Sequence, residues 1–116
     1  MKHFESLKNS GDFSLVYRTG QSKANRQLVM YVRPNGLEKN RLGISVSKKV
    51  GNSVVRHRLT RVIREVFRLN NPNRLEQGLD IVVIARGAAK GKKYQELEKS
   101  FFHLAELHKI VKKSEL

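Results

Sequence analysis

The most constraining feature of this 116-residue sequence is a run from Arg56 to Arg68 in which basic residues alternate with apolar residues at helical spacing. At about 100° per residue, His57, Arg61, Arg64 and Arg68 line up as a narrow stripe along one side of a helix. The opposite, broader side is apolar and consists of Val55, Leu59, Val62, Ile63, Val66 and Phe67. Such a helix must bury its apolar side against other elements. The run therefore predicts a folded domain and not a charged tail.

The charge of this run is unbalanced. An ordinary solvated helix face mixes Glu with Lys at i,i+4 spacing, whereas Glu65 is the only acidic residue between Arg56 and Arg68. The whole chain carries a formal net charge of +14, and residues 41–68 hold eight basic residues against one acidic residue. A positive field focused in this way suits nucleic acid or an anionic membrane. The stripe indicates a polyanion-binding surface, with a solvated face as the plainer alternative.

Length and composition predict one small domain over residues 1–116. The sequence has no cysteine, so it has no disulfide, no Cys-ligated zinc and no thiol nucleophile. Residues 1–5 show no signal-peptide character, and the longest apolar run, residues 81–85, is far shorter than the ~18 residues that span a bilayer. We expect a cytoplasmic protein without a membrane partner.

Local signals predict three helices. Asn9 or Ser10 can cap a helix that ends at Gly20, and Gly51-Asn52-Ser53 can cap the arginine helix, which Asn70-Asn71-Pro72 should terminate. A third helix is expected over residues 94–113.

Residues 27–33 and 41–47 alternate with period two, which predicts two strands paired as a hairpin through Pro34-Asn35-Gly36. Residues 80–85 resemble a fully buried strand, and residues 22–25 could add a short one. The element order α-β-β-α-β-α predicts an α+β sandwich of helices packed on a small central sheet.

One face of the first two strands forms a surface on which an extended chain could lie. Leu28, Met30, Val32, Leu42, Ile44 and Val46 would point to the core, which leaves small side chains beside Tyr31 on the other face. Phe13, Tyr17 and Tyr31 could stack on unpaired bases, as aromatic residues do in single-stranded RNA binding. Core packing is the plainer alternative for Phe13.

Two basic segments adjoin helix starts. Lys48 and Lys49 precede the arginine helix, where cations are disfavoured unless a phosphate binds the free N–H groups of the helix. A basic loop, Lys90-Gly91-Lys92-Lys93, follows the buried strand. It is no P-loop, because three residues instead of four separate its glycines and no Ser or Thr follows the lysine.

The sequence offers little for catalysis. His3, His57, His103 and His108 and ten scattered acidic residues form no HExxH motif, no EF-hand loop and no acidic cluster of metal-binding spacing. We expect no catalytic and no metal-ligating residue in this chain.

From Ser45 through Arg58 and on to Glu65, the sequence resembles the protein subunit of bacterial ribonuclease P. Supporting stretches are Asp12-Phe13 with Val16-Tyr17, Ala24-Asn25-Arg26-Gln27 and Ile84-Ala85-Arg86, so that the resemblance covers essentially the whole chain. The family's Arg-Asn-Arg centre is Arg56-His57-Arg58 here, and Thr60 stands where a basic residue is usual.

The resemblance implies a single RNA-binding domain whose sandwich contains a left-handed β-α-β crossover, a topology also found in a ribosomal-protein domain. It implies the protein component of an endoribonuclease that removes the 5′ leader of precursor tRNA, with Mg²⁺ bound mainly by the RNA and the chemistry carried by a catalytic RNA. One protein is expected per RNA.

The resemblance also assigns residues to two surfaces. Those expected to contact the RNA subunit are Lys49, Asn52, Arg56, His57, Arg58, Arg61, Arg64 and Arg68. Those expected to contact the leader are Phe13, Tyr17, Tyr31, Ser45, Ser47, Lys48 and Arg86. Two other functions stay open: a structural or ribosomal RNA-binding protein of similar fold, and a nuclease that acts without RNA.

Overall fold

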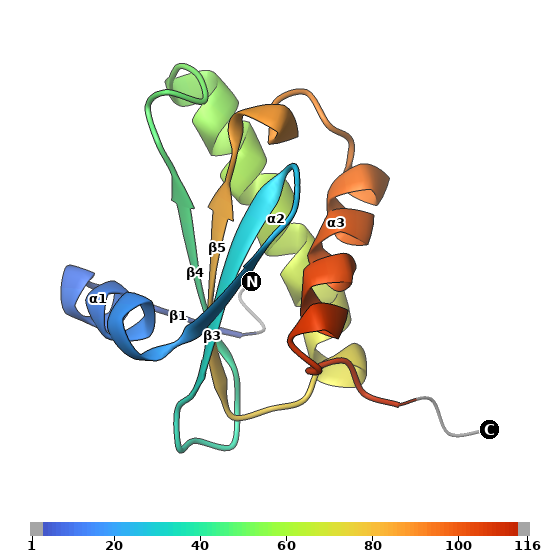
Figure 1. The fold of residues 1–116 in the computed structure, drawn as a ribbon. Coiled ribbons are helices and arrows are strands. Elements are labelled where there is room, and N and C mark those ends of the chain that lie inside the picture. The colour runs from blue at the N-terminus through green and yellow to red at the C-terminus, as the bar shows by residue number, and fades with distance from the viewer. Residues whose placement is uncertain (1–3, 114–116) are drawn as a thin grey trace.

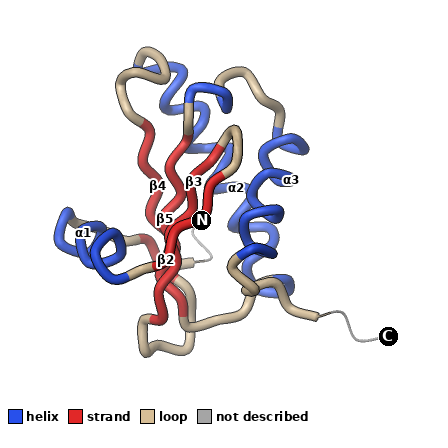
Figure 2. Tube along the Cα trace, in the orientation of Figure 1, coloured by secondary structure: helices blue, strands red, loops and turns tan. Residues whose placement is uncertain are grey.

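The computed structural model describes residues 4–113, so His3 lies outside the described residues. Their chain order begins with β1 (Glu5–Ser6), α1 (Ser10–Thr19), β2 (Gln21–Ala24) and β3 (Leu28–Pro34). It continues with β4 (Arg41–Val46), α2 (Ser53–Arg74), β5 (Leu79–Ala85), a short 3-10 turn η1 (Gly87–Ala89) and α3 (Tyr94–Leu107). The helices α2 and α3 cover one face of the sheet and α1 lies on the other, which confirms the α+β sandwich (Figures 1 and 2).

The five strands lie in the order β1-β4-β5-β3-β2. β5 is parallel to β4 and antiparallel to β3, with Leu42 opposite Ile81 and Met30 opposite Val83. The predicted hairpin of β3 and β4 is therefore wrong, because β5 lies between them. Six connecting residues can cross the two strand spacings of about 4.8 Å each, and β5, with Ile81, Val82 and Val83 fully buried, is the strand suited to the centre.

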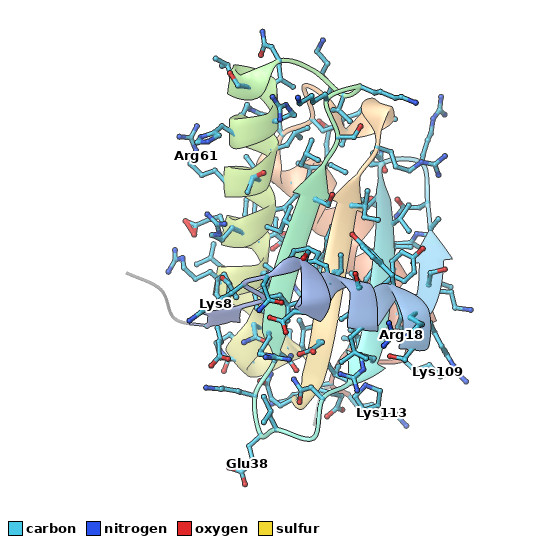
Figure 3. All side chains as sticks on the ribbon, turned by 90° about the vertical axis from the view of Figure 1, so that its left-hand side faces the viewer. Lys8, Arg18, Glu38, Arg61, Lys109 and Lys113 are labelled. Carbon is cyan, nitrogen blue, oxygen red and sulfur yellow. The ribbon has the colours of Figure 1, made fainter. Side chains whose placement is uncertain are left out.

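The β4-α2-β5 crossover is left-handed, as the family resemblance implied. In Figure 3, seen from the α1 side, β4 and β5 both rise and β4 lies to the left of β5, while Figure 1 places α2 on the far side of the sheet. A right-handed crossover seen from this side would put the second strand on the left. General chirality rules predict the right-handed form, so local sequence patterns alone would have given the wrong hand.

The starts of α1 and α2 are as predicted. The Asn9 side chain caps α1 by accepting from the Asp12 N–H, and Asn52 caps α2 by accepting from the Val55 N–H. Each cap satisfies a helix N–H group that has no partner within the helix. α1 ends at Gly20, also as predicted.

The end of α2 differs from the prediction, since the helix continues past Pro72 to Arg74. Proline removes one main-chain hydrogen bond, but side chains hold this last turn in place. Asn40 Nδ2 donates to Asn71 Oδ1 at 2.8 Å, and Gln77 Nε2 donates to the Asn71 carbonyl at 3.0 Å. These side-chain hydrogen bonds compensate for the main-chain hydrogen bond that is lost at Pro72.

α3 is shorter than predicted, because it ends at Leu107 instead of residue 113. Lys109 adopts the left-handed conformation with φ of 61°. The Lys109 N–H donates to the Glu106 carbonyl and the Ile110 N–H donates to the Ala105 carbonyl. This is the Schellman arrangement that closes a helix, and it turns Ile110 back into the core.

The core has two parts. The larger one lies between the sheet and the α2–α3 layer and includes Phe67, which contacts Phe101 at 6.4 Å between ring centroids. The smaller one lies under α1 and contains Leu7, Val16 and Val82. In the described part of the chain no helix is long and apolar enough to cross a membrane.

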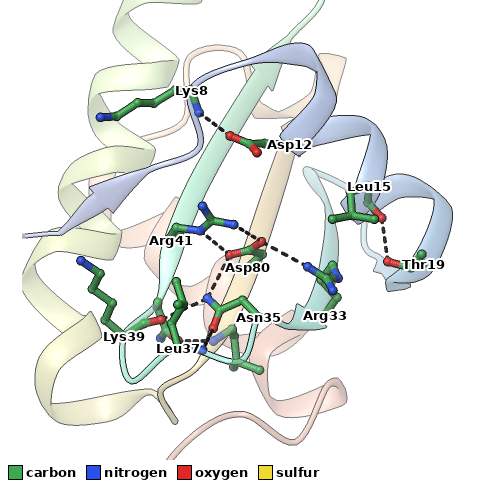
Figure 4. Close-up of polar contacts among 12 residues, drawn as sticks. Lys8, Asp12, Leu15, Thr19, Arg33, Asn35, Leu37, Lys39, Arg41 and Asp80 are labelled. Atoms are coloured by element: carbon green, nitrogen blue, oxygen red, sulfur yellow. Dashed lines mark hydrogen bonds and ion pairs between the residues drawn. The ribbon is translucent and has the colours of Figure 1, made fainter.

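A buried ion pair fixes the end of the sheet below α1. The Asp80 carboxylate, 1% exposed, accepts from Arg41 Nε and Nη2 at 2.8 Å each and from Asn35 Nδ2 at 2.9 Å (Figure 4). Arg33 Nη1 lies 3.6 Å from the same carboxylate. Burial raises the pKa of Asp80, but the hydrogen bonds from Arg41 and Asn35 outweigh this and leave the pKa below its usual value.

Candidate RNA-binding surfaces

The exposed side of α2 presents cations to solvent. His57, Arg61 and Arg64 are exposed, and Arg61 points away from the sheet at the outer edge of the molecule in Figure 3. None of the three has an ion-pair partner within residues 4–113. These side chains are free to contact an anionic partner without first breaking an internal bond.

Two of the other arginines of the run, Arg58 and Arg68, are engaged within the protein. Arg68 pairs with Glu65 through Nη2 and Oε2 at 3.0 Å, and Arg58 Nη2 donates to the Lys92 carbonyl at 2.7 Å. Arg56 is partly buried, and its Nε atom is buried without a hydrogen-bond partner in the described structure. The predicted stripe is thus divided: its centre is free and Arg68 is paired.

The remaining two residues assigned to the RNA subunit lie at the start of α2. Lys49 lies in the loop that follows β4, and Asn52 is the residue directly before α2. Both are exposed. The Asn52 side-chain oxygen is used by the cap at 3.0 Å from the Val55 nitrogen. Gly51 is required here, because a Cβ at this position would lie 2.7 Å from Val55 Cγ1.

Three aromatic rings meet between α1 and the sheet. Tyr17 of α1 packs edge-to-face on Tyr31 of β3, with ring centroids 5.0 Å apart, and Phe13 lies 6.4 Å from Tyr17. Phe13 rests against Gly43 of β4, where an added Cβ would lie 2.6 Å from the ring. Phe13 and Tyr31 are partly buried beside the smaller core, whereas Tyr17 is 39% exposed. Tyr17 is therefore the ring most available to a ligand.

The polar end of Tyr17 adjoins the sheet. Burial raises the pKa of Tyr17, while the nearby Ser45 hydroxyl acts in the opposite direction. This proximity brings Ser45 of β4 together with the aromatic rings, as the assignment of both to one surface requires. The phenol stays protonated at neutral pH, so the ring offers an uncharged stacking face.

The last three residues assigned to the leader follow the parallel strands β4 and β5. Ser47 and Lys48 are exposed beyond β4, and Arg86 is exposed beyond β5. Because Val46 pairs with Ala85, these residues lie at the same edge of the sheet. One nitrogen of the Arg86 guanidinium is already used within the protein, since Nη1 donates to the Asn25 carbonyl at 2.9 Å.

Sequence reasoning gave no structural role to Asn25, which connects the sheet to α3. Its Oδ1 accepts from the Leu28 N–H at 2.9 Å and from Ser100 Oγ at 3.0 Å, and its Nδ2 donates to the Ser100 carbonyl. An Asn between two strands is a typical signal for such a side-chain turn. The contact to Ser100, 75 residues away, has no local signal.

Within residues 4–113, no three His, Asp or Glu side chains gather in a way that could hold a metal ion. Two surfaces remain, one on each side of the sheet. One is the cationic face of α2, and the other is the group of aromatic rings formed by Phe13, Tyr17 and Tyr31, where the resemblance places a leader-binding cleft. Together with the fold, they define a small basic RNA-binding protein.

Comparisons with known proteins identify the family. The Ribonuclease P family model matches residues 1–111. The ribonuclease P protein component of Lachnoclostridium phytofermentans is 60% identical over 111 residues, covering 96% of this chain and 95% of the relative. That of Natranaerobius thermophilus is 43% identical and covers 98% of both chains.

Solved structures agree. The RNase P protein of Staphylococcus aureus matches with a TM-score of 0.83 at 39% identity, covering 92% of this chain and 97% of the other. That of Thermotoga maritima matches with a TM-score of 0.81 at 33% identity, covering 89% and 96%. The chain belongs to the ribonuclease P protein family, and its function is that of the protein component of this endoribonuclease in tRNA 5′ processing.

Proposed function

We propose that the protein binds the catalytic RNA of ribonuclease P through the exposed face of α2 and holds the 5′ leader of precursor tRNA in the cleft between α1 and the sheet. The observation that carries this proposal is the pair of exposed surfaces on the two sides of the sheet: free cations on α2, and the exposed Tyr17 ring packed on Tyr31. Cations suit a folded RNA backbone, and aromatic rings suit unpaired bases.

In this proposal the chemistry belongs to the RNA. Within the described residues no cluster of acidic side chains suits Mg²⁺, so we assign the ion mainly to the RNA subunit and the substrate. We also propose one protein per RNA and a cytoplasmic complex.

Reconstitution tests the function. We expect the protein to accelerate leader removal by a bacterial ribonuclease P RNA at low Mg²⁺, because its cations reduce the repulsion between the RNA and its substrate. Protein freed of RNA should cleave no precursor tRNA at any Mg²⁺ concentration. RNA-free cleavage would support the independent nuclease instead, and RNA binding without acceleration would support a structural RNA-binding protein.

Salt dependence tests the exposed face of α2. Arg61→Ala and Arg64→Ala should each weaken assembly with the RNA subunit and lower the slope of log K against log salt by about 0.7–1 for each phosphate that the variant no longer neutralises. Lys113→Ala, which removes the same charge from the far side of the molecule, is the matched control (Figure 3). Slopes equal to that of the control would show that the stripe is only a solvated face.

A further inference from the structure

The cations that follow β4 and β5 gather at one end of the molecule. Because the two strands are parallel, the segments 47–58 and 86–96 continue from the same edge of the sheet, at the top of Figure 1. Glu96 is the only acidic residue in the two segments. Their cations are Lys48, Lys49, Arg56, Arg58, Arg86, Lys90, Lys92 and Lys93. The basic loop 90–93 thus extends the charge of α2.

This loop is built into the fold. Arg58 Nη2 reaches from α2 to the Lys92 carbonyl at 2.7 Å. Ala89, just before the loop, is fully buried, and its N–H donates to the Arg86 carbonyl. Gly91 takes a φ of 78°, a conformation that other residues rarely adopt. The loop is therefore held at a fixed place beside α2.

Two of the loop cations remain uncompensated. Lys92 Nζ lies 3.7 Å from Glu96, and Glu96 also accepts from the Lys93 main-chain N–H at 3.2 Å. The side chains of Lys90 and Lys93 are exposed and have no ion-pair partner among the described residues. Like charges held near Arg58 repel one another, and a polyanion would relieve that repulsion.

We propose that the loop Lys90–Lys93 is a second phosphate-binding segment for the RNA subunit, and that Arg58 is the residue that positions it. This inference rests on the proposed function. The partner is the RNA subunit because Arg58 ties the loop to α2, on the side of the sheet opposite α1 and its aromatic cleft. The two cationic segments then contact separate stretches of the RNA backbone.

The test uses reconstituted holoenzyme and the double variant Lys90→Gln, Lys93→Gln. We expect weaker assembly with the RNA subunit and a salt slope lower by up to about 2, since each phosphate that is no longer neutralised lowers the slope by about 0.7–1. The matched control is Lys109→Gln, Lys112→Gln, which removes the same charge at the opposite end of α3. A slope equal to that of the control would overturn the inference.

The salt slopes of the two sets of variants distinguish failure of the proposed function from failure of this inference. If Arg61→Ala lowers the slope and the loop variant does not, the function stands and the loop proposal falls. A loop effect that appears only with long-leader precursor tRNA, and not in assembly with the RNA subunit, would also overturn it.

The positioning role of Arg58 has its own readout. In an Arg58→Gln background, replacing Lys90 and Lys93 should change assembly less than it does in the wild type, because the loop is no longer held. Strictly additive effects would contradict that role. Arg58→Lys keeps the charge but not the planar donor group. In this background too, replacing Lys90 and Lys93 should change assembly less than it does in the wild type.

Discussion

Replacing Asp80 with alanine is expected to lower the free energy of unfolding by about 3 kcal/mol, because removing one partner of a buried ion pair leaves the other charges uncompensated. The carboxylate is 1% exposed and receives two hydrogen bonds from Arg41 and one from Asn35. The side chains of Arg41 and Arg33 are 23% and 25% exposed. Because these two arginines still contact water, we expect a loss of stability at the lower end of the range for buried ion pairs.

Chemical denaturation of Asp80→Ala and the wild type measures this difference. The control is Glu5→Ala, which removes the partly exposed carboxylate that pairs with the exposed Lys39 Nζ at 2.6 Å. Exposed ion pairs contribute little to stability, because water screens them, so this variant should unfold close to the wild type. Equal losses of stability in the two variants would show that burial of Asp80 does not matter.

The same group predicts how stability depends on pH. The pKa of Asp80 is lower in the folded protein than in the unfolded chain, so the unfolded chain binds the proton more tightly. The stabilisation is complete above the unfolded-state pKa of about 3.9 and is lost as pH falls through the folded-state pKa. Asp80→Asn should lack this part of the acid destabilisation. An acid profile parallel to that of the wild type would contradict the assignment.

Local structure was predictable where local chemistry decides it. Asn9 and Asn52 cap their helices as their sequence context indicates, and the apolar run of β5 is buried. The order of the strands was not predictable, because the alternation in β3 and β4 fits pairing with each other as well as pairing with β5. Likewise, no local signal marks Lys109, whose left-handed conformation ends α3.

In the candidate site, too, features that depend on contacts between distant residues were not predictable. Residue spacing identified the arginine stripe, but the division between free and engaged arginines depends on contacts made elsewhere. Arg58 is bonded to a residue 34 positions away, and no periodicity of α2 could reveal that bond. Strand alternation predicted the surface of small side chains beside Tyr31, and the resemblance implied the cleft. The exposure that favours Tyr17 over Phe13 depends on how α1 packs against Gly43.

Substitution of Tyr17 by alanine is expected to weaken substrate binding by reconstituted holoenzyme by about 1–3 kcal/mol, the usual value of one base stack. This weakening should appear with a leader of several nucleotides. It should vanish with a leader of one nucleotide, which is too short to reach the cleft, and with mature tRNA. Tyr17→Phe is the matched control, because it retains the ring and removes only the hydroxyl group next to Ser45.

Tyr31 should show the same dependence on leader length, with one difference. Its ring is partly buried beside the smaller core, so Tyr31→Ala should also lower the stability of the protein. Since the two rings are 5.0 Å apart, their effects on binding should not add in the double variant. Arg61→Ala should instead weaken assembly whatever the leader. A Tyr17 or Tyr31 effect that is independent of leader length would make the rings structural and remove the cleft from the substrate path.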